Sequence, residues 1–144
     1  MAILTVEEQE RVAHAVSLAE GQTSGEIRVV VEHIVGKTSA HEKAVQYFNK
    51  LKMCNTHLRN GVLIYLAIED HQFAIIGDVG IHQYVNADFW ENTSQKMLPY
   101  FKEAAYVDGL VAGIQEAGIQ LKNYFPRADD DINELPNEIY FGNN

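Results

Sequence analysis

Residues 59–85 read RNGVLIYLAIEDHQFAIIGDVGIHQYV, and this stretch decides the fold of the 144-residue chain. Two mainly apolar runs of strand length, Val62–Ile68 and Gln72–Ile76, flank a short polar turn, which predicts a β-hairpin. The first run is apolar at every position, so we expect it to be a central strand with both faces covered. The second run leads into Gly77-Asp78-Val79-Gly80, where the glycines permit a tight turn that carries a carboxylate.

The segments before the hairpin supply a helix, a strand and a second helix. Thr5 and Glu8 have capping-box spacing, and so have Ser39 and Glu42. With the apolar periodicity that follows each pair, they predict a helix at 6–20, a strand at 26–32 and a helix from 39 to about 51. A strand–helix–strand order favours two parallel neighbouring strands, to which the hairpin adds an antiparallel third. The sheet should therefore be small and mixed.

The sequence after the hairpin predicts two more helices. Asn86 or Asp88 caps the first of them, and Pro99 interrupts it, because proline lacks an N–H donor and crowds the preceding turn. Asp108-Gly109 opens the last long helix, which Pro126 ends.

These elements together indicate the α/β class, as a three-layer α/β/α sandwich in which helices flank a small mixed sheet. The length, with 47% hydrophobic residues, predicts one domain with a real core at residues 1–126. Residues 127–144 form an acidic C-terminal tail. Its isolated apolar residues favour partial docking on the domain over full flexibility.

The composition opposes several classes of function. A formal net charge of -9 is unfavourable for a nucleic-acid or anionic-membrane surface, since both need clustered Lys and Arg. The sequence shows neither a signal peptide nor a run of membrane-spanning length, so we expect no membrane insertion and a cytoplasmic location. Cys54 is the only cysteine, which excludes an intramolecular disulfide and a thiolate metal cluster.

Three oxygen-bearing side chains are expected to meet at one end of the sheet. Glu26 begins the first strand, Asn60 precedes the second, and Asp78 follows the third, which runs in the opposite direction. Calcium and magnesium take ligands from carboxylate and carbonyl oxygens, so this set predicts a shallow Ca²⁺ or Mg²⁺ site. Asp108 joins the site if the last helix begins nearby. The alternative is that Asp78 caps a turn and Asp108 caps a helix.

Arg59 lies beside this predicted site and has two candidate roles. Its planar guanidinium suits a phosphate oxygen, or it pairs with Glu26 or Asp78 and competes with a cation. The carboxylates of the tail, at 129–131, are a rival cation site. Ligands of open α/β sheets usually bind beyond the carboxyl ends of the parallel strands, here near 69–71, but the residue chemistry favours the first end.

Several motifs, in this order and spacing, resemble one family over nearly the whole chain: Thr23–Val29, Asn60–Ile64, Gly77–Ile81, Asp88-Phe89-Trp90, Pro99-Tyr100-Phe101 before Asp108-Gly109, Phe125-Pro126 and Asn133–Pro136. The family is the TPM domain, named from a thylakoid lumen protein, a photosystem II repair protein and a nematode receptor modulator. The sequence is similar to its small soluble bacterial branch. The resemblance implies an α/β/α sandwich, a divalent cation such as Ca²⁺ bound at acidic residues, and acid phosphatase activity in some plant members.

Three functions are therefore expected, in order of preference. The first is a divalent-cation-binding domain, with Ca²⁺ as the expected ion, that acts as a binding or accessory module. The second is a metal-assisted acid phosphatase, in which the cation polarises a phosphate ester and Arg59 neutralises transition-state charge. It comes second because no residue stands out as a nucleophile or general acid. The third is a structural protein-interaction domain that uses the tail to bind a partner.

Overall fold

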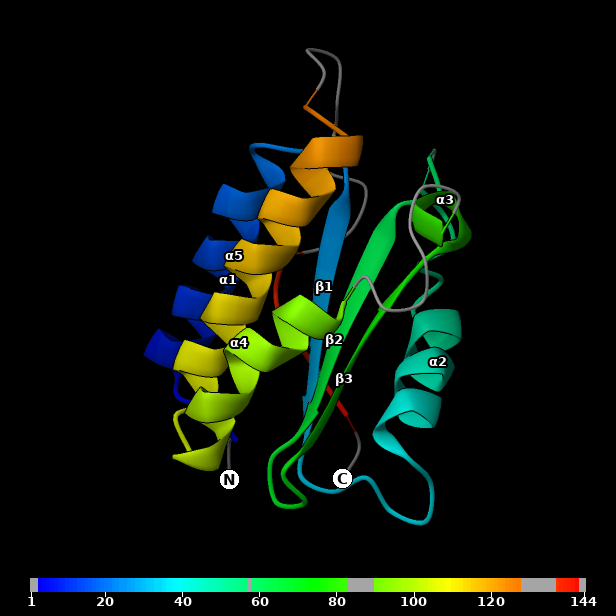
Figure 1. The fold of residues 1–144 in the computed structure, drawn as a ribbon. Coiled ribbons are helices and arrows are strands. Elements are labelled where there is room, and N and C mark those ends of the chain that lie inside the picture. Colours follow the sequence, from blue (N-terminus) through cyan, green and yellow to red (C-terminus); the bar gives the residue numbers. More distant parts are fainter. Residues whose placement is uncertain (1–2, 57, 83–89, 128–136, 143–144) are drawn as a thin grey trace.

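A four-stranded mixed sheet forms the middle of the molecule, in the order β3-β2-β1-β4 (Figure 1). The computed structural model describes residues 3–56, 58–82, 90–127 and 137–142. Its strands are β1 (Glu26–Glu32), β2 (Gly61–Ala67), β3 (Gln72–Gly77) and β4 (Tyr140–Phe141). β2 pairs in parallel with β1 and antiparallel with β3, as predicted. All seven residues of β2 are buried, which confirms a central strand.

Helices cover both faces of this sheet (Figure 1). α1 (Val6–Glu20), α4 (Glu91–Lys102) and α5 (Tyr106–Tyr124) lie on one face, and α2 (Ala40–Lys50) lies on the other; the one-turn helix α3 (Val79–His82) follows β3. Alternate strand residues point to opposite faces, so Val29 and Ile64 belong to the core under α1, α4 and α5, whereas Val30 and Tyr65 belong to the core under α2. The predicted α/β/α sandwich is confirmed.

Both predicted capping pairs lie at helix starts. The Thr5 hydroxyl accepts a hydrogen bond from the Glu8 N–H at 3.1 Å, and the Glu8 carboxylate accepts one from the Thr5 N–H at 2.9 Å. At the start of α2, the Ser39 hydroxyl accepts from the Glu42 N–H at 3.1 Å. These bonds satisfy N–H groups that the first turn of a helix leaves without intrahelical partners.

The strand register sets which residues share an end of the sheet. Glu26 is aligned with Gly61 in the parallel pair, and Val62 is aligned with Gly77 in the hairpin. The starts of β1 and β2 and the finish of β3 therefore lie together, and we call this the amino end of the sheet. The opposite end, where β1 and β2 finish, is the carboxyl end.

Pro99 does not interrupt the fourth helix, contrary to the sequence prediction. It lies inside α4, which continues to Lys102. Proline has no N–H to donate to the Gln95 carbonyl, and Gln95 is an exposed residue. Met97 and Phe101 are buried against the core on either side of the proline, and this packing maintains the helix.

The last helix begins at Tyr106 and not at Asp108-Gly109. Gly109 is needed for packing, because a Cβ there would lie 2.4 Å from the Phe101 ring of α4. The glycine therefore marks a close approach of two helices, which the sequence analysis took for a helix start.

β4 is a strand that the sequence analysis did not predict. Tyr140 and Phe141 pair in parallel with Val30 and Val31 of β1, and the Gly142 N–H donates to the Val31 carbonyl at 3.0 Å.

The caps predicted at Asn86 and Asp88 lie outside the described residues, as do the tail carboxylates at 129–131. No helix in the described part of the chain is both long and apolar enough to cross a membrane.

Candidate functional site at the amino end of the sheet

Three of the predicted ligands lie at the amino end of the sheet. The Glu26 N–H donates to the Asn60 carbonyl at 3.4 Å, and the Asp78 N–H donates to the Gly61 carbonyl at 2.9 Å. Glu26, Asn60 and Asp78 are 3%, 1% and 4% exposed. Within the described residues, however, no three His, Cys, Asp or Glu side chains are grouped closely enough to hold a metal ion. The three residues share an end of the sheet without forming a ready-made cage.

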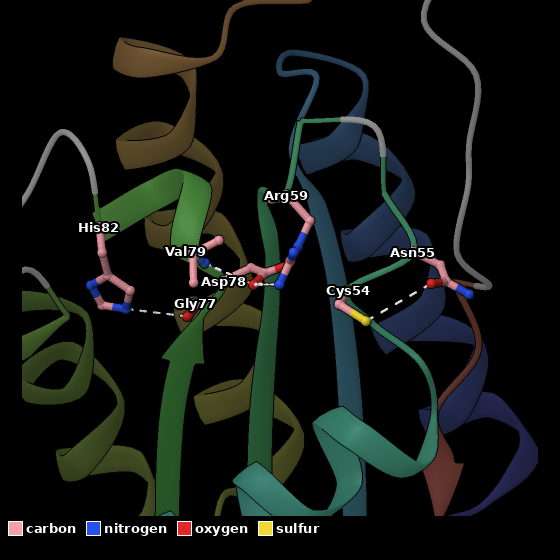
Figure 2. A network of polar contacts seen from close by, with 7 residues as sticks. All are labelled: Cys54, Asn55, Arg59, Gly77, Asp78, Val79 and His82. Atoms are coloured by element: carbon pink, nitrogen blue, oxygen red, sulfur yellow. Dashed lines mark hydrogen bonds and ion pairs between the residues drawn. The ribbon is translucent and has the colours of Figure 1, made fainter.

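Asp78 is engaged by Arg59 through both carboxylate oxygens (Figure 2). The Arg59 Nε donates to Oδ2 at 2.7 Å and Nη2 donates to Oδ1 at 2.9 Å, while Oδ1 also accepts the Val79 N–H at 2.7 Å. The carboxylate is buried, whereas the Arg59 side chain is 46% exposed. Of the two candidate roles for Arg59, the structure shows the ion pair with Asp78. A paired guanidinium supplies the positive charge that a cation would otherwise bring.

The backbone holds this ion pair in place. Arg59 has φ +52°, and its carbonyl accepts the Gly80 N–H at 2.8 Å. A Cβ on Gly80 would lie 2.2 Å from the Leu58 carbonyl oxygen and 2.5 Å from that of Arg59, so a larger residue cannot fit without backbone movement. The Gly-Asp-Val-Gly motif thus locks the end of β3 onto the loop that precedes β2.

A residue that the sequence analysis missed, Glu20, faces Glu26. Its carboxylate Oε2 accepts the Ile27 N–H at 2.7 Å, and the Glu26 side chain hydrogen-bonds to it. Burial raises the pKa of Glu20 to about 9, with a further rise from the charge and hydrogen bond of Glu26, against a lowering by the Ile27 N–H and Arg127. The raised pKa means that Glu20 keeps a proton at neutral pH.

The position of Glu20 follows from the open edge of β1. The Glu26 N–H points toward β2, so the Ile27 N–H points to the other side, where β4 reaches only Val30 and Val31. The Glu20 carboxylate takes the place of a neighbouring strand. The sequence held one signal of this role. Glu20 is the last residue of α1, where a negative charge is unfavourable because it lies at the negative end of the helix dipole, and the last turn has no basic residue to offset it.

Asp108 lies near the carboxyl end, so the structure does not bring it together with the other three predicted ligands. Its carboxylate forms an ion pair with Arg11 of α1 at 2.7 Å, and both side chains are about half exposed. Tyr106, two residues before it, has its hydroxyl 3.5 Å from the carbonyl of Ile68 in the hairpin turn. The C-terminal end of α5, and not its start, lies at the amino end of the sheet. There the Phe125 carbonyl accepts a hydrogen bond from the Ser24 N–H at 2.9 Å.

Other polar groups border the amino end. The Asn60 Nδ2 atom is buried and, in the described part of the chain, has no hydrogen-bond partner. His82 is exposed, with Nε2 3.2 Å from the Gly77 carbonyl oxygen (Figure 2). The Asn60 amide nitrogen is thus a buried hydrogen-bond donor at this end without a partner among the described residues.

The comparisons with known proteins agree with this fold. The family model of the TPM domain matches residues 1–120, and no curated protein matches the sequence. The NMR structure of protein BA42 from the psychrophilic bacterium Bizionia argentinensis is 46% identical, with a TM-score of 0.91, over 98% of this chain and 97% of that one.

Two more distant structures share the fold alone. The N-terminal domain of a protein from P. gingivalis is 17% identical with a TM-score of 0.71, over 86% of this chain and 80% of that one. The N-terminal domain of cg2496 from Corynebacterium glutamicum is 13% identical with a TM-score of 0.66, over 83% and 74%. Since the family model covers most of the sequence, the chain belongs to the TPM domain family.

Proposed function

We propose that this chain binds one divalent cation, Ca²⁺ or Mg²⁺, at the amino end of the sheet and acts as a binding or accessory module. The observation that carries the proposal is the buried Glu20–Glu26 pair, which keeps a proton at neutral pH. Two buried carboxyl groups in contact ionise together only if a positive charge lies between them. A divalent cation supplies that charge and takes the place of the proton.

The residues present fit a cation bound mainly by oxygen. Ca²⁺ takes six to eight oxygen ligands, and Mg²⁺ retains several waters. Glu20 and Glu26 supply carboxylate oxygens, and the buried Asn60 side chain supplies its amide oxygen. Asp78 contributes only if Arg59 leaves it, so this ion pair competes with the cation.

The test is a titration of the ¹⁵N-labelled full chain with CaCl₂ and with MgCl₂. Binding should shift the amide signals of Gly25 to Ile27 together, and in weakly buffered solution at pH 7 it should release about one proton per ion. The apparent affinity should rise about tenfold for each pH unit between pH 6 and 8, because the ion displaces a proton from a group with a pKa near 9.

Two variants make the titration specific. Glu26→Gln removes one carboxylate from the pair and should abolish binding, whereas Asp108→Asn at the carboxyl end should leave the affinity unchanged. Shifts without proton release, or equal binding by the native chain and Glu26→Gln, would place the ion elsewhere and contradict the proposal.

A metal-assisted acid phosphatase is the second candidate. The half-exposed Arg59 guanidinium beside Asp78 favours it, since such a group neutralises the charge of a phosphate oxygen when it swings outward. Turnover of an aryl phosphate by the native chain and by Asp78→Asn, with and without Ca²⁺ or Mg²⁺, tests this function. Equal rates for the two proteins would attribute the turnover to a contaminant and would exclude this site.

A further inference from the structure

The two edges of the sheet differ in length. β4 forms one edge with two residues, whereas β3 forms the other over Gln72–Gly77 (Figure 1). In the described part of the chain, no strand pairs with the outer side of β3. Natural proteins protect long edge strands with charged side chains, prolines or bulges, because the unpaired backbone of an edge recruits other strands. β3 contains no charged residue and no proline, so its edge is suited to a partner that adds a strand.

The backbone of β3 presents hydrogen-bonding groups at its outer side. The Asp78 N–H donates to the Gly61 carbonyl of β2 at 2.9 Å, and every second N–H group of an antiparallel strand points the same way. The N–H groups of Phe73, Ile75 and Gly77 therefore point away from β2, and within the described residues none of the three has a hydrogen-bond acceptor. With the carbonyls of Phe73 and Ile75, they match the main chain of an extended peptide.

A hollow of about 410 Å³, which we call the first hollow, lies against the C-terminal part of this edge. It is lined by Val45 and Phe48 of α2, by Ile75 and Ile76 of β3, and by Trp90. Ile75 packs with the core under α4, and Ile76 packs with the core under α2. Because both side chains line the same hollow, it opens at the edge of the strand and not on one face of the sheet. A strand added at this edge places an apolar side chain in it.

A second hollow, of about 290 Å³, lies near the beginning of β3. It is lined by His71 of the hairpin turn and by Leu98, Phe101 and Lys102 of α4. The Phe101 ring contacts the Phe73 ring of β3, with ring centres 5.0 Å apart, so this hollow is on the face of the sheet that α4 covers. Side chains of a strand alternate between the two faces, so one extended segment fills both hollows with separate side chains.

The polar side chains of the two hollows are histidines and a lysine. His41 and His82 line the first, His71 and Lys102 line the second, and no acidic side chain of the described residues lines either. The whole chain has a formal net charge of -9, so this edge is a local exception. A lysine attracts a carboxylate, and an imidazole N–H donates a hydrogen bond to one. The charges therefore fit a segment that carries acidic residues beside its apolar ones.

We infer that the outer edge of β3 is a docking site for an extended acidic peptide segment of another protein, which adds a fifth strand to the sheet. The main chain of the segment pairs with Phe73 and Ile75. One apolar side chain enters the first hollow and another enters the second, while a carboxylate of the segment meets Lys102. This inference goes beyond the proposed function and does not depend on it, because no residue of the proposed cation site lines either hollow.

The experiment titrates the ¹⁵N-labelled full chain with a capped hexapeptide of sequence Glu-Ile-Thr-Thr-Val-Glu and follows amide hydrogen exchange. The isoleucine and valine of this probe are three residues apart, so they point to opposite faces of an added strand. In the free chain, the amides of Phe73 and Ile75 should exchange fast, whereas those of Ala74 and Ile76, which are bonded to β2, should exchange slowly. At a peptide concentration ten times the Kd, exchange at Phe73 and Ile75 should slow about tenfold.

Three variants locate the bound peptide. Val45→Glu places a charge in the first hollow and should weaken binding about tenfold or more. Val6→Glu is the matched control, because Val6 lines neither hollow, and the affinity should not change. Val45 and Val6 are 40% and 68% exposed, so both variants should fold, which their amide spectra check. Lys102→Glu should weaken binding about threefold and should make the chain prefer a probe with lysine in place of glutamate.

Four results would overturn the inference. Slow exchange at Phe73 and Ile75 in the free chain at every protein concentration would mean that the edge is already covered. Protection that grows with protein concentration in the absence of peptide would make a second copy of this chain the occupant. Equal affinities of the native chain and Val45→Glu, or no saturable protection by the probe, would exclude this edge as its site. None of these results bears on the proposed Ca²⁺ or Mg²⁺ site, because that titration reports on Gly25 to Ile27.

Discussion

The two ends of the sheet each bury carboxyl groups, but they balance the charge in opposite ways. At the amino end, Glu20 and Glu26 face each other, and a proton keeps them from repelling. At the carboxyl end, Glu32 faces Lys43, so the protein supplies its own counter-charge. A buried pair of like charges needs an outside partner, whereas a buried pair of opposite charges is already neutral. This difference is the reason that the proposed function places the divalent cation at the amino end and not at the carboxyl end.

The ends also differ in how they are closed. At the amino end, the Gly80 backbone lies against the carbonyls of Leu58 and Arg59 in the middle of the chain. At the carboxyl end, Gly142 lies against side-chain atoms of Tyr47 and Glu32, and β4 pairs with β1 through two residues only. Backbone wedged against other backbone cannot move without disturbing the elements on both sides of it, whereas a short segment with few pairings separates at a lower cost.

The largest expected effect separates these two closures. Gly80→Ala places a Cβ 2.2 Å from a backbone oxygen and should lower the free energy of unfolding by about 3 kcal/mol or more. Gly142→Ala should cost about 1 kcal/mol, because the segment lifts and leaves the domain folded. Urea unfolding followed by circular dichroism measures both values. Equal losses would mean that the C-terminal segment is as integral to the fold as the Gly80 turn.

A matched control for these two variants is Gly21→Ala. Gly21 has φ -66°, and its added Cβ would lie 3.4 Å from the Leu18 carbonyl oxygen and 3.6 Å from that of Ser17, which are ordinary van der Waals contacts. An alanine fits this conformation, so stability should stay level or rise by about 0.5 kcal/mol. A loss as large as that of Gly80→Ala would show that glycine is needed for a reason other than close backbone approach.

The second-largest expected effect is a dependence of stability on pH, which comes from the proton on Glu20 at the amino end of the sheet. Folded Glu20 keeps its proton up to about pH 9, whereas in the unfolded chain it loses it near its ordinary value of 4.5. The native state binds the additional proton, so stability is highest below the lower value and falls as pH rises toward 9, by up to about 1.4 kcal/mol per pH unit. Glu20→Gln should remove this dependence, because glutamine is neutral and still accepts the Ile27 N–H.

The measurement is the difference in unfolding free energy between Glu20→Gln and the native chain at pH 6, 7 and 8. It should grow in favour of the variant by about 1.4 kcal/mol per unit. Glu116→Gln is the matched control: hydrogen bonds from Lys96 and then Gln120 lower the pKa of Glu116, so its stabilisation is complete above pH 4.5 and is lost only in more acidic solution. Its difference from the native chain should be level from pH 6 to 8. A level difference for Glu20→Gln as well would mean that Glu20 is ionised in the folded chain.

The sequence was sufficient for features that depend on local pattern and strand direction. Capping pairs, the apolar run of β2 and the parallel–antiparallel order placed Glu26, Asn60 and Asp78 at one end. It was insufficient where tertiary contacts decide: Gly109 allows a close approach of Phe101 inside α5, which begins at Tyr106, and does not mark a helix start. Glu20 was missed because its partner is the backbone N–H of Ile27, at a position of β1 that β4 does not pair with. Hydrophobic periodicity in the sequence does not show which backbone N–H groups a sheet leaves for side chains.

A smaller effect concerns the ion pair at the amino end. Asp78→Asn keeps the size of the side chain but loses the carboxylate that accepts three hydrogen bonds in a buried position, so we expect about 2 kcal/mol less stability. If Arg59 competes with the bound ion through Asp78, this variant also changes Ca²⁺ affinity less than Glu26→Gln does. The same titration and urea curves give both numbers. A complete loss of Ca²⁺ binding would instead make Asp78 the main ligand.

The smallest expected effect is at Asp108, the predicted ligand that lies at the wrong end of the sheet. Its ion pair with Arg11 joins two half-exposed side chains, and such pairs contribute little because water and salt screen them. Asp108→Asn should therefore change the unfolding free energy by less than about 0.5 kcal/mol, and less still in 0.5 M salt. The Ca²⁺ affinity should be that of the native chain. A lowered affinity would mean that a cation is bound near the start of α5, and the division of roles between the two ends of the sheet would then be wrong.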